Sequence, residues 1–528
     1  MTAPAPPRDP DGTPPESGAT FRDPDRAARG AARGGLANMA GSALAGGTGV
    51  VVTWVVARTL GPEQAGAFFA ATAAFVLAGG LAKLGTNTGL VYWPARLRAT
   101  GNGHLLGACL RAGIPPVAVF SLVLAVAMWL AAPAIARLTA AESPHVVADH
   151  VAGLRILAVF LPLQALTDVL LTVTRGYREM RPTVLLDRVL RSGLQLLAVT
   201  AAGITTLWVA ASLPVFALAW ASPYLPVAVL AGWAARRAYA SNRPPGVTTR
   251  REERSRLRRD FWIFTGPRAI AAVAQLALQR VDVLLVAALG GLAPAAVYAV
   301  AGRFVVLIQF ANQGLSQSVQ PRLAEALATG DREAANRLYQ TATGWLVLVT
   351  WPINLLVVAC APWYLRLFGD GYAAGRPVVL VLAAAMLVAT GCGMVDMVLA
   401  MAGRTSMNLG NVLAALVVMI GVDLFLIPRW GATGAATGLA CAVVVNNLLP
   451  LAQVHRTAGL HPFGTGTRAA ALLSLGCFGV LPAAATPLTG LLPALTTAVP
   501  AYFAGAWLLR RELGLAAFAR RRSQLEES

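Results

Sequence analysis

Lysine is almost absent from this chain of 528 residues. Lys83 is the only one, and Ala82 precedes it, so the sequence contains no GxxxxGK phosphate-binding loop. This excludes an ATPase on the same chain as the source of energy for any transport.

Cysteine and histidine are also scarce, at five residues each. The cysteines all lie inside apolar segments, and the histidines lie in or beside loops without the spacing of metal ligands. We therefore expect no disulfide bond, no metal site and no bound cofactor. A buried cysteine in such a segment serves as a small hydrophobic side chain.

Charged residues make up only 13% of the chain, whereas hydrophobic residues make up 56% and the mean hydropathy is +0.62. A soluble globule of this size needs more polar surface, so the composition predicts a protein that crosses the lipid bilayer many times. The net charge of +19 would suggest nucleic acid in a soluble protein. Here the arginines lie mainly between apolar segments, where the positive-inside rule explains them, so we expect no nucleic-acid partner.

The predicted fold class is an all-α polytopic membrane protein with about 14 transmembrane helices. Residues 1–35 are rich in Pro, Gly, Asp and Arg and have no apolar run typical of a signal peptide, which predicts a disordered, basic cytoplasmic tail. The apolar segments lie near residues 36–57, 65–91, 107–132, 151–174, 183–203, 207–235, 261–289, 295–320, 340–364, 377–401, 407–427, 432–454, 467–486 and 489–509.

The arginines predict the orientation of these segments. About thirty lie in the two tails, the even-numbered loops and a connector over residues 236–260, whereas only five lie on the opposite side. Positive charge concentrates on the cytoplasmic side of membrane proteins. We therefore expect a multi-pass protein of the cytoplasmic membrane with both termini inside.

The basic connector also divides the chain into two similar halves. Residues 58–76 correspond to 287–305, and residues 174–190 correspond to 401–417, at nearly the same offset. This predicts a parallel repeat of two six-helix bundles with a central cleft between them. The predicted units are a bundle at 36–235, the connector at 236–260, a second bundle at 261–454, two further helices within 467–509 and a cytoplasmic tail at 510–528.

The segment that begins at residue 261 is long enough to cross the membrane yet carries unusual polar residues. Arg268, Gln275, Gln279 and Asp282 recur at spacings of seven, four and three residues, which places them on one face of a helix, and Arg280 lies beside that face. Charges inside a bilayer are costly and are therefore candidates for function. The alternative is an ion pair that only fixes helix packing.

Other apolar segments carry polar faces of the same kind. In the segment after 295, Gln309 and Gln313 follow Arg303 at helical spacing, and Arg191 can pair with Asp187 one turn earlier. Packing or snorkelling to the interface offers an alternative role for several of these residues. We expect no catalytic residue, and the candidate substrate-binding residues of the cleft are Arg268, Gln275, Gln279, Arg280, Asp282, Arg303, Gln309, Gln313, Lys83, Arg191 and Asn38.

Four runs of sequence resemble a known family of transporters. They are QRVDVLLVAALGGLAPAAVYAVAGRF, SVQPRLAEALATGDREAANRLYQ at 318–340, WPINLLVVACAPWYLRLFGDGYAAGRPVVLVLA, and GRTSMNLGNVLAALVVMIGVDLFLIPRWGATGAATG at 403–438. They resemble the polysaccharide exporter branch of the multidrug/oligosaccharidyl-lipid/polysaccharide (MOP) superfamily. The fourteen segments are similar in number to those of the lipid II flippase and of some O-antigen or exopolysaccharide flippases in that branch.

The resemblance implies two six-helix bundles in a V shape and outward flipping of a polyprenyl-pyrophosphate-linked glycan by alternating access. Arginine suits such a cargo because its planar guanidinium donates two parallel hydrogen bonds to phosphate oxygens. Coupling to the membrane potential, to protons or to sodium is expected, and a glycan polymerase or glycosyltransferase would be a protein partner. Three alternatives are a cation-coupled exporter of drugs or metabolites, a membrane-embedded glycosyl polymerase, ligase or transferase, and a scaffold that binds the glycan lipid without moving it.

Overall fold

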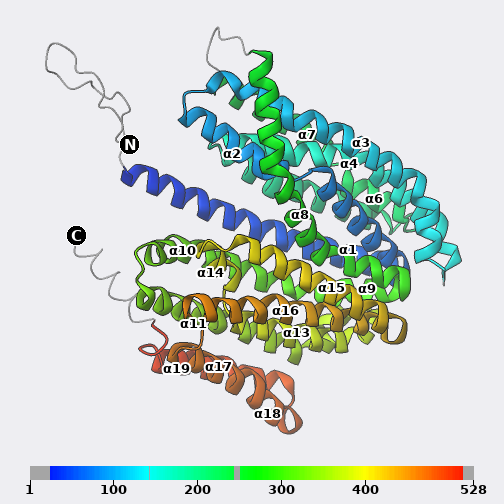
Figure 1. Ribbon diagram of the computed structural model, residues 1–528. Coiled ribbons are helices and arrows are strands. Elements are labelled where there is room, and N and C mark those ends of the chain that lie inside the picture. Colours follow the sequence, from blue (N-terminus) through cyan, green and yellow to red (C-terminus); the bar gives the residue numbers. More distant parts are fainter. Residues whose placement is uncertain (1–23, 142, 243–249, 515–528) are drawn as a thin grey trace.

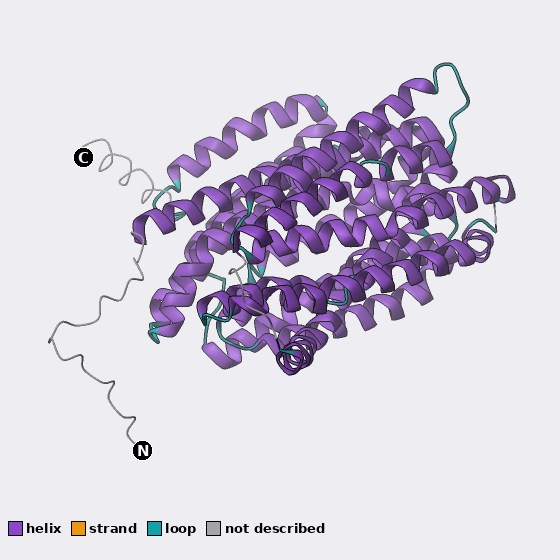
Figure 2. Cartoon of the chain, turned by 90° about the horizontal axis from the view of Figure 1, so that it is seen from above, coloured by secondary structure: helices purple, strands orange, loops and turns teal. Residues whose placement is uncertain are grey.

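The computed structural model describes residues 24–141, 143–242 and 250–514. Within these ranges every regular element is a helix and none is a strand. Figure 2 shows the helices lying side by side along a common direction. The predicted class, an all-α polytopic membrane protein, is confirmed.

The first half of the chain, residues 24–242, forms the N-terminal bundle. Its elements are α1 (Pro24–Ala82), α2 (Thr86–Ala99), η1 (Gly103–Leu105), α3 (Leu106–Thr139), η2 (Pro144–Val146), α4 (Val147–Gly176), η3 (Thr183–Arg191), α5 (Ser192–Thr205), α6 (Leu213–Ala221) and α7 (Tyr224–Asn242).

The second half forms the C-terminal bundle and is followed by three shorter helices. The bundle contains α8 (Arg251–Leu289), α9 (Leu292–Ala301), η4 (Gly302–Phe304), α10 (Val305–Ala328), α11 (Arg332–Ala359), α12 (Ala361–Phe368), η5 (Asp370–Gly375), α13 (Arg376–Gly391), α14 (Val395–Met401), α15 (Thr405–Trp430) and α16 (Ala432–Ala458). The appended elements are α17 (Thr465–Ser474), η6 (Leu475–Val480), α18 (Leu481–Thr489) and α19 (Leu491–Leu508).

The two bundles form two layers (Figure 1). Helices α3, α4, α6 and α7 lie in one layer and α10, α11, α13, α15 and α16 in the other; the first part of α1 lies along the boundary, and α8 crosses the first layer to reach it. Helices α17 to α19 lie on the side of the C-terminal bundle that faces away from the N-terminal bundle, where α17 packs on α11. The boundary between the layers is therefore where a central cleft can form.

Twelve helical stretches in the described ranges are long and apolar enough to cross a membrane. The difference from the fourteen predicted segments has two sources. The segments predicted at 36–57 and 65–91 belong to one stretch, Gly41–Ala99, that is kinked at Gly61. The segment predicted at 183–203 forms η3 and α5, where Asp187, Arg188 and Arg191 lower the hydropathy.

In both bundles, the turn between the first two predicted segments contains a glycine with nearly the same backbone conformation. Gly61 has φ 73° and ψ 174°, and Gly291 has φ 89° and ψ 174°. These values lie in a region that only glycine enters without strain. Gly61 and Gly291 are therefore required by the turn, although the correspondence of 58–76 with 287–305 pairs Gly61 with Gly290, one residue earlier. We call the end of the molecule that holds these turns the kink end, and the opposite end, where α7 ends and α8 begins, the connector end.

The two bundles contact each other closely at the kink end. The indole Nε1 of Trp54 donates to the carbonyl of Leu367 at 2.8 Å, and the Tyr372 hydroxyl donates to the carbonyl of Ala57 at 3.3 Å. Gly66 of α1 packs so tightly on α9 that an added Cβ would lie 1.8 Å from the Leu292 carbonyl oxygen. The structure is therefore closed between the bundles at the kink end.

Candidate functional site

A polar cavity lies between the two bundles, and we call it the central cavity. One part, of about 320 Å³, is lined by α8, α10, α13 and α16 of the C-terminal bundle. The other part, of about 200 Å³, is lined by α1, α5 and α6 on the N-terminal side. The two parts adjoin, because Arg280, Val283, Ala299 and Arg303 line both.

Arg191 enters the cavity from the N-terminal bundle and is held there by its neighbours. Its Nε donates to Oδ1 of Asp187 at 2.7 Å, and its Nη1 donates to Oε1 of Gln195 at 2.9 Å. The guanidinium also lies 5.4 Å from the ring centre of Tyr224. Arg191 is the last residue of η3, a π-helix, and such segments often mark functional sites because they re-aim side chains.

Arg280 and Arg303 enter the same cavity from the C-terminal bundle. The Nε atoms of both are buried and make no hydrogen bond, and within the described ranges neither guanidinium forms an ion pair. Arg303 lies 5.8 Å from the ring centre of Phe69, across the boundary between the bundles. Two guanidinium groups that lack anionic partners are costly at this depth.

The acidic residues around the cavity are engaged elsewhere. Asp187 pairs with Arg191, and Asp282, which is buried, accepts hydrogen bonds from the Tyr298 hydroxyl and from the backbone N–H of Val283 at 2.7 Å. Asp282 also interacts electrostatically with Arg280, so Arg280 and Arg303 together leave the cavity with an excess of positive charge. An anion with several oxygen atoms would satisfy both groups.

Glutamines continue from the cavity toward the connector end. Gln275, Gln279 and Gln309 line the C-terminal part of the cavity and have exposed side chains. Gln313 lies one turn further along α10 and is also exposed, although it does not line the cavity. With the kink end closed, this polar face gives the cavity an approach from the connector end.

Of the eleven residues predicted from the sequence, seven line the central cavity: Arg191, Gln275, Gln279, Arg280, Asp282, Arg303 and Gln309. Arg268 does not; it is exposed, donates to the Phe264 carbonyl at 2.7 Å and lies 3.8 Å from the Phe264 ring centre.

Two further predicted residues lie in the N-terminal bundle. Lys83 pairs with Asp168 at 2.8 Å within that bundle and does not line the central cavity. The side chain of Asn38 falls outside the residues whose side chains the structure describes, although its backbone belongs to α1.

Two residues near the cavity were not predicted. Tyr298 donates to Asp282, and Asn446 of α16 lines the cavity with its amide oxygen buried and without a hydrogen bond. Two adjacent amides within the apolar run VVVNNLL are a signal that could have identified Asn446. Tyr298 has no such signal, because a tyrosine in an apolar helix usually serves packing.

Asp423 of α15 is the most deeply buried acid in the C-terminal bundle. Its side chain is 0% exposed, and neither carboxylate oxygen has a hydrogen-bond partner among the described residues. Its electrostatic interactions reach both Asp282 and Tyr298. A buried carboxylate without a partner is unfavourable unless a proton or a cation neutralises it.

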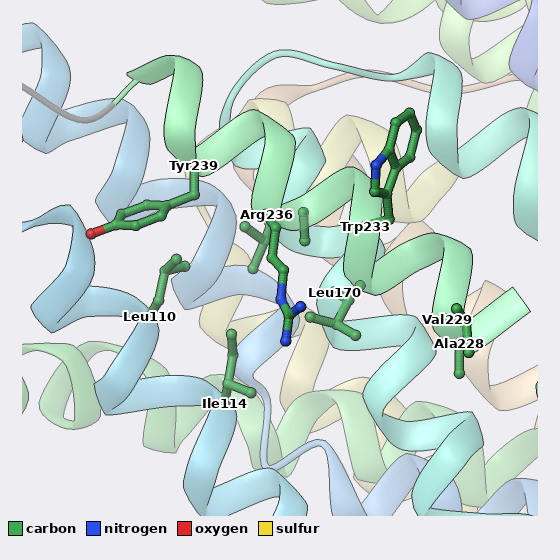
Figure 3. Close-up of a pocket in the computed structure, with 11 residues that line it drawn as sticks. Leu110, Ile114, Leu170, Ala228, Val229, Trp233, Arg236 and Tyr239 are labelled. Carbon is green, nitrogen blue, oxygen red and sulfur yellow. The ribbon is translucent and has the colours of Figure 1, made fainter.

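A further cavity, of about 650 Å³, lies outside this site. It is a groove on the N-terminal bundle between α3, α4 and α7 (Figure 3) and shares no lining residue with the central cavity. The Arg236 side chain extends between Ile114 and Leu170, and the exposed ring of Trp233 borders the groove. Its walls are mainly apolar, so it differs in chemistry from the arginine-lined cavity.

No group of three or more His, Cys, Asp or Glu side chains in the described ranges could hold a metal ion. The polar groups that line the central cavity are mainly guanidinium and amide groups.

The fold is similar to that of transporters of the MOP superfamily. A family model described as "Polysaccharide biosynthesis protein" matches residues 31–327, more than half of the chain, and the chain belongs to this family. A second model, MatE, matches residues 267–428. No curated protein sequence matches the chain.

Solved structures of this superfamily share the fold. "Lipid II flippase MurJ, inward closed conformation" has a TM-score of 0.69 at 13% identity, over 90% of this chain and 98% of that one. An inward-facing multidrug resistance MATE family transporter has a TM-score of 0.59 at 18% identity, over 78% and 94%. A MOP superfamily transporter from Pyrococcus furiosus has a TM-score of 0.54 at 17% identity, over 81% and 95%. These are transporters or a flippase and not enzymes, in agreement with the sequence analysis.

Proposed function

We propose that this protein is a flippase that moves a polyprenyl-pyrophosphate-linked oligosaccharide from the inner to the outer leaflet of the cytoplasmic membrane by alternating access. The observation that carries the proposal is the pair Arg280 and Arg303, two half-buried arginines in a cavity between the bundles whose Nε atoms are buried without a hydrogen bond and which form no ion pair with the described residues. A pyrophosphate supplies the charge and the oxygen atoms that these groups lack.

The proposed cycle begins with the conformation described above. The kink end faces outward and is closed by the contacts of Trp54, Tyr372 and Gly66, while the glutamine face offers an approach from the cytoplasm. Pyrophosphate binding would bring Arg191 of one bundle and Arg280 of the other onto a shared ligand. Rocking of the bundles would then open the kink end, as in other repeat-built transporters.

The energetics favour outward movement of an anionic headgroup. Each negative charge that moves out of a negative interior gains about 2.3 kcal/mol per 100 mV of membrane potential. A pyrophosphate diester carries about two such charges, so the potential alone could drive the step.

A cation-coupling site is proposed at Asp423 and Asp282. Both are buried, they come from different helices, and the oxygen atoms of Asp423 have no protein partner in the described ranges. A proton or sodium ion bound there would neutralise the pair and favour one arrangement of α8 against α15. Asp423→Asn would then remove any dependence of transport on the ion gradient, whereas unchanged dependence would exclude this role.

The test of the flippase proposal uses purified protein in proteoliposomes with a labelled lipid-linked oligosaccharide. Flipping is measured as protection of the label from an external glycosidase. Arg280→Ala and Arg303→Ala should each reduce flipping about 10- to 100-fold, because a charge-assisted contact is worth about 1.5 to 3 kcal/mol. The matched control is Arg268→Ala, which removes an arginine of the same helix that lies outside the cavity.

Lysine at either position should give an intermediate rate, because a point charge keeps the attraction but loses the paired hydrogen bonds. Normal flipping by both alanine variants would remove these arginines from the mechanism. A loss as large in Arg268→Ala would mean that arginine removal acts through folding and not through the cavity.

Export of a small cation is the second candidate function, favoured by the MatE match over residues 267–428. The cavity argues against it, because a cationic cargo requires acids without basic partners. Among the described residues that line this cavity, the charged groups with an unpaired buried atom are Arg280 and Arg303.

A further inference from the structure

A second groove with basic residues lies between α3 and α8 near the connector end. It has a volume of about 530 Å³ and shares no lining residue with the central cavity. Its wall on α3 runs from Arg111 to Val123, and Arg258 of α8 closes the other side. The groove therefore joins the N-terminal bundle to the first helix of the C-terminal bundle.

The two arginines of the groove are available to a ligand. Arg111 donates its Nε to the carbonyl of Gly107 at 3.2 Å, one turn earlier, and among the described residues its two terminal nitrogens have no hydrogen-bond partner. No ion pair involves Arg111 or Arg258 within the described ranges, and no acidic residue lines the groove. Two guanidinium groups from different helices thus face one space without an anion, a chemistry suited to a phosphate.

The rest of the groove is apolar and faces outward. Val119 is 65% exposed and Val123 is 55% exposed, and Phe120 lies between them. From Arg111 to Val123 the helix advances about 18 Å, close to the thickness of one leaflet of a hydrocarbon core about 30 Å thick. A ligand that fills the groove would have an anionic head at the arginines and an apolar tail along the valines.

Two adjacent prolines add hydrogen-bond acceptors at the head of the groove. Pro115 and Pro116 have no N–H, so the carbonyls of Arg111 and Ala112 one turn earlier lose their helical donors. Headgroup hydroxyls could donate to these carbonyls while the phosphate binds the guanidinium groups. This combination favours a phospholipid over a simple inorganic anion.

We propose that this groove binds an anionic phospholipid of the cytoplasmic leaflet, with its phosphate between Arg111 and Arg258 and one acyl chain along Val119 and Val123. The proposal rests on the orientation given above and not on the identity of the transported lipid. Because Leu257 and Phe261 of α8 already pack into the core of the N-terminal bundle, the lipid would strengthen the same contact. It would thus stabilise the arrangement in which α8 lies against α3.

The test uses the full-length protein in detergent, supplied with phosphatidylglycerol or phosphatidylcholine. Retained lipid is counted by native mass spectrometry, and the Tm is measured with each lipid. The test variant is Arg111→Gln with Arg258→Gln. The matched control is Arg137→Gln, because Arg137 lies near the other end of α3 and makes the same contact, Nε to the Pro133 carbonyl at 3.1 Å.

Wild type and Arg137→Gln should retain phosphatidylglycerol in preference to phosphatidylcholine and gain Tm with it. The double variant should bind phosphatidylglycerol at least about tenfold more weakly and lose the gain in Tm, while its elution volume in size exclusion stays unchanged. Equal retention by the double variant and the control would overturn the proposal, as would equal retention of both lipids by the wild type.

Two competitors distinguish the alternative occupants. Displacement of the bound lipid by inorganic pyrophosphate would identify an anion site instead of a lipid site. Displacement by a polyprenyl pyrophosphate at lower concentration than by phosphatidylglycerol would assign the groove to the transported cargo. Either result would refute the phospholipid proposal, and because neither measures flipping, the outcome is independent of the flippase test.

Discussion

Gly66 offers a direct perturbation of the closed kink end. It belongs to α1, and a methyl group in place of its hydrogen would lie 1.8 Å from the carbonyl oxygen and 2.6 Å from the carbonyl carbon of Leu292 in α9. Real Cβ atoms essentially never approach another heavy atom within 3.0 Å. Because the obstacle is backbone, Gly66→Ala should force the two bundles apart by roughly 1 Å at this end.

Such overpacking costs about 1 to 3 kcal/mol in the closed arrangement. If the two bundles are separated at the kink end in the alternative conformation, the added methyl group does not destabilise that conformation. The ratio of open to closed protein should then rise about 5- to 150-fold. We therefore expect Gly66→Ala to shift the population toward an arrangement open to the outside.

The assay is the labelling of a single cysteine at Ala299, which lines both parts of the central cavity. In a cysteine-free background, a membrane-impermeant thiol reagent added outside should react much faster in Gly66→Ala than in the parent. Gly47→Ala is the control, because Gly47 lies on the same helix with no atom near its Cβ position. Unchanged labelling in a folded Gly66→Ala protein, or an equal increase in the control, would refute the reasoning.

Two further predictions concern orientation and stability. Exposed cysteines at Thr329 and Ala374 should be labelled from the cytoplasm and from outside respectively, and labelling of Thr329 in intact cells would reverse the orientation. Lys83→Met should lower the Tm through an unpaired Asp168 at a cost of about 1 to 3 kcal/mol, and Lys83→Met with Asp168→Asn should recover part of it. A double variant less stable than Lys83→Met would show that the 2.8 Å pair is not the source of the loss.

The sequence predicted the fold class because the periodicity and composition of a segment can be determined without knowing which segments pack against it. The spacing of Gln275, Gln279 and Asp282 defines one helix face whatever lies beside it, and the structure places all three on the central cavity. The repeat predicted from residues 58–76 and 287–305 is reflected in the similar backbone conformations of Gly61 and Gly291, which favour glycine.

Other features depend on neighbours that a single sequence does not show. Arg268 shares the predicted face but lies one and a half turns or more from the cavity residues, where Phe264 provides a local partner for its guanidinium. Lys83 finds Asp168 in another helix of its own bundle. The π-helix that ends at Arg191 adds a register change that a regular helical period does not predict.

Asp423 was not predicted as a site residue for the same reason, because its environment depends on neighbouring helices. Asp423 lies near the end of a predicted segment, a position where an acid is usually solvated at the interface. The structure shows it fully buried, with electrostatic contact to Asp282 of another helix. Only the packing of α15 against α8 gives Asp423 its unusual environment.

The central claim is that the arginine-lined cavity carries an anionic, pyrophosphate-linked lipid. The most direct measurement supplies wild-type proteoliposomes with an imposed membrane potential and offers, in parallel, a labelled polyprenyl-pyrophosphate oligosaccharide and a cationic dye. The account predicts that the oligosaccharide crosses to the positive side at a rate that rises with the potential, and that the dye does not move faster than in empty liposomes. Dye expulsion under a proton gradient without movement of the oligosaccharide would contradict it.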